Sequence, residues 1–131
     1  MAFNAADQIY HCPVVAGVPA GVDDKVEKEI DLNELLIKKP AATFFVKVAG
    51  LSMIDAGIRH GDILVVDRSI EPINDKIVIA SLDGELTVKR LNLKGKRVQL
   101  VADNDDFAPI AISEEMNFQI LGVVTSVIHV M

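Results

Sequence analysis

The chain has 131 residues, half of them hydrophobic, which is enough for one compact domain with its own core plus a short extension. Its 19 acidic and 13 basic residues give a formal net charge of −6, and the basic residues are scattered, so direct specific DNA binding is not expected. The single cysteine, Cys12, excludes a disulfide framework and a cysteine-based zinc site, and it agrees with a reducing cytoplasm.

The first residues lack the basic start of a secretory signal, and Asp7, Gln8 and His11 interrupt the apolar run that such a signal needs. No stretch approaches the roughly eighteen apolar residues of a membrane-spanning helix. We therefore expect a soluble, cytoplasmic protein.

The N-terminal residues differ in composition from the rest of the chain. Residues 12–21 are small and apolar, and prolines and glycines interrupt them, so neither a helix nor a continuous strand is expected. Disordered tails are usually polar, and this stretch is not. We predict an extended arm over residues 1–29 and a single β domain over residues 30–131.

The predicted domain opens with one short helix and continues as β structure. Asp31 is a good N-cap for an amphipathic helix over residues 32–39, and Pro40 would end it. Asp83-Gly84 between two β-rich runs predicts a type I′ hairpin, and Gly122 marks a bend or bulge in the last run. The predicted strands cover residues 43–48, 62–67, 76–82, 85–91, 97–101 and 118–130. Many short strands separated by turns indicate a mostly β fold, an antiparallel sandwich or partly open barrel.

Ser52 is a candidate nucleophile. It lies in Gly50-Leu-Ser-Met53, directly after a predicted strand, where its hydroxyl would be accessible and backbone N–H groups would be available to an oxyanion. A serine in a glycine-containing turn is more often only a turn residue. The assignment therefore needs a base.

Two residues compete as that base. His60 is close in sequence, but no third group is identifiable to orient it, and His11 and His129 cannot be placed near Ser52 from sequence. Lys89 lies in the second arm of the predicted hairpin, and alternation puts it on the face of Thr87, with its neighbour Arg90 on the other. A lysine base must be neutral, which requires a pKa about three units below its ordinary value of about 10.4, and burial can produce such a shift. The apolar arm is a candidate cover.

Other kinds of site are not supported by the pattern. Asp103-Asn-Asp-Asp106 lacks the spaced ligands and the terminal glutamate of a calcium loop, and we interpret it as a solvated turn. No glycine-rich phosphate loop is present. No metal and no cofactor are expected.

Together, these segments resemble one family, the LexA/UmuD self-cleaving serine–lysine peptidases. Gly50-Leu-Ser-Met53 with Gly57-Ile-x-x-Gly61-Asp62 is similar to their serine segment, and residues 83–91 are similar to their lysine hairpin. Ala16-Gly17 matches their small-residue scissile pair at the expected distance upstream. The resemblance runs from about residue 14 to the C-terminus, and residues 30–37 and 43–47 look closer to UmuD than to LexA.

The resemblance implies the fold of the LexA C-terminal peptidase domain, with Ser52 as nucleophile and Lys89 as general base. It also implies an oxyanion hole of main-chain N–H groups at Leu51, Ser52 or Met53. Cleavage between Ala16 and Gly17 would be stimulated by the RecA–single-stranded-DNA filament. The product would be a homodimer that supports an error-prone Y-family polymerase, a UmuC-like subunit, in translesion synthesis during the SOS response.

Three alternatives remain open at the level of sequence. Ala20-Gly21 is a second small pair and a second candidate cleavage bond, and UmuD itself has Cys-Gly where this chain has Ala-Gly. The chain could instead be a catalytically idle polymerase accessory that retains Ser52 and Lys89. It could also be the peptidase domain of a truncated LexA-like or phage repressor, since sixteen residues before the cut are too few for a helix-turn-helix.

Overall fold

The structure, a computed structural model, describes residues 29–131. They fall into two compact units divided between Lys38 and Lys39. The predicted arm over residues 1–29 lies outside the described residues except for Glu29, and so do both candidate cleavage pairs. No helix in the described part of the chain is long and apolar enough to cross a membrane.

The first unit contains the predicted helix in a shorter form. Helix α1 spans Leu32–Leu36, and the Asp31 carboxylate caps it by accepting from the N–H groups of Asn33 at 3.0 Å and Glu34 at 3.4 Å. The cap is confirmed, but the predicted extension to residue 39 is wrong. Ile37 already has an extended backbone, as suits a β-branched residue, and the position before Pro40 disfavours helix.

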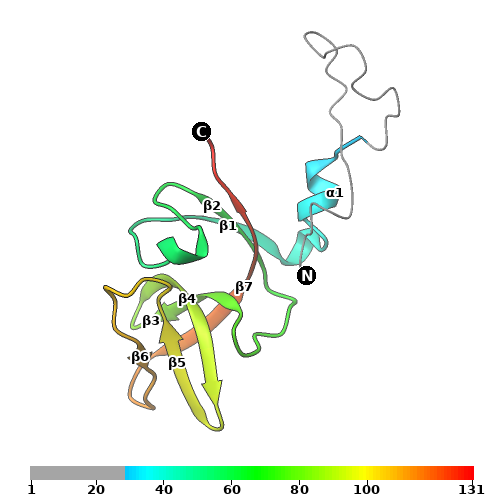
Figure 1. The fold of residues 1–131 in the computed structure, drawn as a ribbon. Coiled ribbons are helices and arrows are strands. Elements are labelled where there is room, and N and C mark those ends of the chain that lie inside the picture. Colours follow the sequence, from blue (N-terminus) through cyan, green and yellow to red (C-terminus); the bar gives the residue numbers. More distant parts are fainter. Residues whose placement is uncertain (1–28) are drawn as a thin grey trace. The chain divides into compact units, whose positions relative to one another are not determined.

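The second unit is one antiparallel sheet of seven strands in the order β1-β2-β7-β3-β4-β5-β6 (Figure 1). Two 3₁₀ turns, η1 (Pro40–Ala42) and η2 (Ile54–Ala56), precede and follow the first strand. The strands are β1 (Thr43–Lys47), β2 (Ile63–Asp67), β3 (Ile77–Leu82), β4 (Glu85–Lys94), β5 (Arg97–Val101), β6 (Ile110–Ala111) and β7 (Phe118–Ile128). The prediction of a mostly β, antiparallel fold with one short α-helix is confirmed; the two-residue strand β6 was not predicted.

Strand β7 joins the two halves of the sheet. Its C-terminal half pairs with β2 and its N-terminal half with β3, with a register shift in each pairing (Figure 1). Gly122 lies at the crossing, where a Cβ atom would be only 2.6 Å from Val66 Cγ1, so only glycine allows this approach without displacement. Of the predicted bend or bulge at Gly122, the structure has the bulge: Gly122 pairs with Ile79 and Ile120 with Ala80, so one residue of β7 is left over beside Gly122.

The β3–β4 hairpin fixes the position of the lysine. Leu82 pairs with Glu85, and both residues between them have positive φ, 49° at Asp83 and 87° at Gly84, as a type I′ turn requires. The predicted hairpin is confirmed. Its register places Lys89 opposite Val78, in a long and regular part of the ladder.

Hydrophobic side chains form two clusters on the sheet. Val78 and Ile79 are neighbours in β3 and belong to different clusters, because successive side chains of a strand point to opposite faces. The first cluster contains Val48, Met53, Ile58, Leu64, Val66 and Ile79. The second contains Val78, Ala80, Leu91, Leu100 and Val123. Met53 and Ile58 of the first cluster belong to the loop that carries Ser52, so this cluster packs the loop against the sheet.

Candidate active site

The loop after β1, residues 49–60, is called the serine loop below. Its two ends are joined by backbone hydrogen bonds: Val48 N–H donates to Asp62 O at 2.8 Å, and Gly61 N–H donates to Val48 O at 2.8 Å. The loop therefore leaves and rejoins the sheet at a fixed point. Gly50, at φ +95°, provides the sharp change of direction on the way to Ser52.

Ser52 itself lies between an exposed and a buried neighbour. Leu51 is exposed, whereas Met53 is only 1% exposed and packs in the first hydrophobic cluster. The carbonyl of Met53 accepts from Ala56 N–H at 3.1 Å and Ile58 N–H at 3.3 Å. The residue that follows Ser52 is thus fixed by packing and by hydrogen bonds, and the serine side chain is partly buried.

The side chain of Lys89 ends at Ser52. Its Nζ atom lies 3.0 Å from Ser52 Oγ, 2.7 Å from Thr87 Oγ1 and 3.2 Å from Val88 O. The predicted face shared by Lys89 and Thr87 brings these two polar atoms into contact. The structure therefore brings together two residues that are 37 positions apart in sequence.

Partial burial lowers the pKa of Lys89 below its ordinary value, because the charged ammonium loses hydration there. The three contacts match the hydrogen-bonding capacity of a neutral amine. A neutral Nζ has two N–H donors, which Thr87 Oγ1 and Val88 O can accept, and one lone pair, to which the Ser52 hydroxyl can donate. In that state, the amine can take the serine proton.

The histidines have other partners. His60 Nδ1 accepts from Gly50 N–H at 3.1 Å, so this ring supports the start of the serine loop. His129 Nδ1 lies 2.6 Å from Asp62 Oδ1, and the N–H of Arg59, followed by His129, lowers the pKa of Asp62. Within residues 29–131 neither ring makes a hydrogen bond to Ser52. His11 lies outside the described residues.

The backbone around Ser52 offers donors to a ligand. Among the hydrogen bonds found in the described part of the chain, none has the N–H of Leu51, Ser52 or Met53 as its donor. Such N–H groups beside a nucleophile can stabilise an oxyanion if they point towards it.

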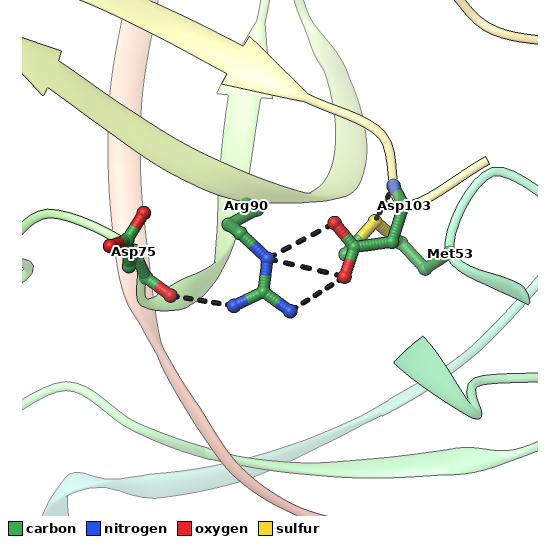
Figure 2. Close-up of polar contacts among 4 residues, drawn as sticks. All are labelled: Met53, Asp75, Arg90 and Asp103. Carbon is green, nitrogen blue, oxygen red and sulfur yellow. Dashed lines mark hydrogen bonds and ion pairs between the residues drawn. The ribbon is translucent and has the colours of Figure 1, made fainter. Parts of the chain in front are cut away.

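The prediction of a solvated turn over residues 103–106 holds for the last two residues and is wrong for Asp103 and Asn104, which are partly buried and have partners. Asp105 and Asp106 are exposed, but the carboxylate of Asp103 forms an ion pair with Arg90, 2.6 Å from Nη2 to Oδ2 (Figure 2). Asn104 Nδ2 donates to Leu51 O at 2.8 Å. Asp103 and Asn104 therefore contact the serine loop. The only sequence signal for this contact was the charged residue Arg90, which follows Lys89 and lies on the opposite face of the strand. In the described residues no cluster of His, Cys, Asp and Glu is arranged to hold a metal ion.

Comparisons with known proteins agree with this architecture. A family model described as Peptidase S24-like matches residues 8–125. The chain is 48% identical over 118 residues to protein SamA of Salmonella typhimurium, covering 90% of this chain and 80% of SamA. It is 47% identical over 115 residues to protein ImpA of Escherichia coli, covering 87% and 77%.

A more distant match supports the same grouping. The LexA repressor of Pectobacterium carotovorum is 39% identical to this chain over 117 residues, covering 88% of this chain but 57% of the repressor. The resemblance to the LexA/UmuD peptidases is therefore confirmed, and the chain belongs to the Peptidase S24-like family.

Proposed function

We propose that this chain is a self-cleaving serine peptidase in which Ser52 is the nucleophile and Lys89 the general base. The observation that carries the proposal is the 3.0 Å separation of Lys89 Nζ and Ser52 Oγ. Membership of the Peptidase S24-like family supports it. The lowered pKa of Lys89 supports it further, because a neutral lysine is the form that can act as a base.

The proposed bond is Ala16–Gly17, in the arm over residues 1–29. Neutral Lys89 takes the proton of the Ser52 hydroxyl as Oγ bonds to the carbonyl carbon of Ala16, and backbone N–H groups at residues 51–53 stabilise the oxyanion. The C–N bond then breaks, and the Lys89 ammonium returns its proton to the amine of Gly17. Water attacks the acyl–enzyme by the same general-base step, which frees Ser52 and releases residues 1–16.

Docking of the arm over the site would activate its own cleavage. Lys89 is only partly buried in the described residues, and an apolar segment lying over it would remove more of its hydration. Further loss of hydration would lower the pKa of Lys89 again and raise the neutral fraction at pH 7. We propose that the RecA–single-stranded-DNA filament stimulates cleavage by stabilising this docked state.

The product is proposed to act as a homodimer with a UmuC-like Y-family polymerase, in cytoplasmic translesion synthesis during the SOS response. The similarity to UmuD in residues 30–37 and 43–47 supports this assignment. So does the identity of 48% to SamA, against 39% to the LexA repressor. The net charge of −6 favours recruitment to DNA through protein partners rather than by direct contact.

Intact-mass measurement tests the proposed activity. Purified chain is incubated at pH 7 and pH 10, alongside Ser52→Ala and Lys89→Ala variants. The proposal predicts a product beginning at Gly17, formed faster at pH 10, and no product from either variant. A product beginning at Gly21 would move the cleavage site to the second small pair. Cleavage of either variant at the parent rate would exclude the assigned dyad, and an intact parent chain under all conditions would favour the idle accessory.

A further inference from the structure

Strand β4 carries a second charged side chain next to Lys89. Because successive side chains of a strand alternate, Arg90 lies on the opposite face of β4. Its guanidinium holds Asp103 through both carboxylate oxygens, with Nε 3.0 Å from Oδ1 and Nη2 2.6 Å from Oδ2 (Figure 2). A third donor, Nη1, binds Asp75 O at 2.7 Å. Arg90 is therefore fixed on two sides, and a two-pronged contact of this kind holds a carboxylate in a defined orientation.

Asp103 in turn holds the serine loop through its backbone. Its carbonyl oxygen accepts from Asp55 N–H at 2.8 Å, and its N–H donates to Met53 Sδ at 3.2 Å. The next residue, Asn104, donates from Nδ2 to Leu51 O. These contacts reach residues 51, 53 and 55, so they lie on both sides of Ser52.

We propose that Asp103, anchored by Arg90, is a positioning residue that sets the distance between Ser52 and Lys89. The inference deepens the proposed function and rests on it for its catalytic consequence. One strand, β4, carries both the base and the anchor of the nucleophile's loop. The positions of both reacting side chains therefore depend on two adjacent residues of β4: Lys89 is the base itself, and Arg90 holds the loop of Ser52 through Asp103.

The arrangement matters because the serine loop has little regular structure of its own. It contains only the three-residue turn η2, and its ends are fixed at Val48 and Gly61. Proton transfer depends steeply on geometry, and a misplacement of about 1 Å at a reacting group can cost about a hundredfold in rate. A loop released from Asp103 keeps its sequence and its hydrophobic anchor but loses the contacts that flank Ser52.

The test uses the full chain and the first-order rate of self-cleavage at its high-pH plateau, where Lys89 is neutral in every variant. Asp103→Asn preserves the backbone groups that bind residues 53 and 55, but it removes the charged partner of Arg90 that holds them in place. We expect a plateau rate about ten- to a hundredfold lower. Arg90→Gln should cause a similar loss, the double variant should be no slower than the slower single variant, and Arg90→Lys should retain more activity than Arg90→Gln.

Asp67→Asn is the matched control. Asp67 is a buried aspartate whose carboxylate, like that of Asp103, accepts hydrogen bonds, in this case from Ser69. It lies at the end of β2 and outside the serine loop. All rates are compared at equal folded fraction, determined by thermal unfolding. If Asp103→Asn stays within twofold of the parent, if it is no slower than Asp67→Asn, or if the single effects multiply in the double variant, the inference is wrong.

Amide hydrogen exchange separates this inference from the proposed function. In Asp103→Asn, exchange should accelerate in residues 50–56 and remain unchanged in β7. Unchanged exchange in residues 50–56 would overturn the positioning role, whether or not the chain cleaves itself. If the parent chain does not cleave itself but exchange in residues 50–56 accelerates in Asp103→Asn, the proposed peptidase activity is refuted. The role of Asp103 in holding the serine loop would then still stand.

Discussion

Thr87 Oγ1 lies 2.7 Å from Lys89 Nζ, the shortest of the three polar contacts of the lysine amine. Two residues apart on β4, their side chains share one face of the sheet. The hydroxyl can accept one of the two N–H bonds of a neutral amine. The lone pair is then free to face Ser52, so Thr87 orients the proposed base as well as contacting it.

Thr87→Val should slow self-cleavage without stopping it. The substitution preserves the branched shape and removes the acceptor, at a cost of about 1 kcal/mol for one hydrogen bond, equivalent to about fivefold in rate. The measurement is the first-order rate of fragment formation at fixed pH. Thr87→Ser should stay near the parent rate. Thr125→Val, which removes a hydroxyl bonded to Val65 O on β2, is the control and should leave the rate unchanged; equal effects of the two valine variants would count against the orienting role.

Lys89 should reduce the stability of the folded chain. Its pKa is lowered by burial, so the folded state disfavours the ammonium, and the penalty is greatest at and below the folded-state pKa. Stability from this group rises with pH above that point, until the penalty disappears near the ordinary pKa of about 10.4. In a Ser52→Ala background, which prevents cleavage, Lys89→Met should raise the Tm by a few degrees at pH 7. The gain should shrink towards pH 10, and a gain that is absent at pH 7 would show that the amine is well hydrated.

Asp62 should stabilise the folded chain, and its contribution should change with pH in the acid range, whereas that of Lys89 changes in the alkaline range. The N–H of Arg59 and then His129 lower its pKa, so its contribution is present above the unfolded-state value of about 3.9 and lost as pH falls through the folded value. Asp62→Asn should therefore reduce stability to urea at pH 7, and the difference from the parent should narrow below about pH 4. Asp106→Asn, at an exposed turn position, serves as the reference. A difference that is constant between pH 3 and pH 7 would contradict this assignment.

Local sequence patterns predicted much of the fold. Runs of β-favouring residues separated by turn residues identified six of the seven strands, and Asp83-Gly84 identified the hairpin. The period of two placed Thr87 and Lys89 on one face. These features depend on residues close in the chain, where backbone preferences and side-chain direction decide the outcome. The end of α1 was misplaced because Ile37 and the approach to Pro40 outweigh the amphipathic pattern.

The site was only partly predictable for the same reason. Ser52 and Lys89 could be named as candidates, but their contact depends on the order of strands in the sheet, which the pattern of each strand does not contain. The ion pair of Arg90 and Asp103 joins two residues across the β4–β5 hairpin, just beyond the end of β5, so in the sequence Asp103 resembles an ordinary solvated turn residue. Long-range geometry, rather than residue type, distinguishes it from Asp105 and Asp106.

The central claim is that neutral Lys89 activates Ser52 to cut Ala16–Gly17. Its most direct test is the rate of formation of the fragment beginning at Gly17, measured by intact mass between pH 6 and pH 11. The account predicts a rate that rises with pH as one proton is released and then reaches a plateau. The midpoint of the rise should lie below the ordinary lysine pKa of about 10.4. It also predicts that Lys89→Ala abolishes the reaction at every pH. A rate independent of pH, or a Lys89→Ala variant that follows the parent profile, would contradict it.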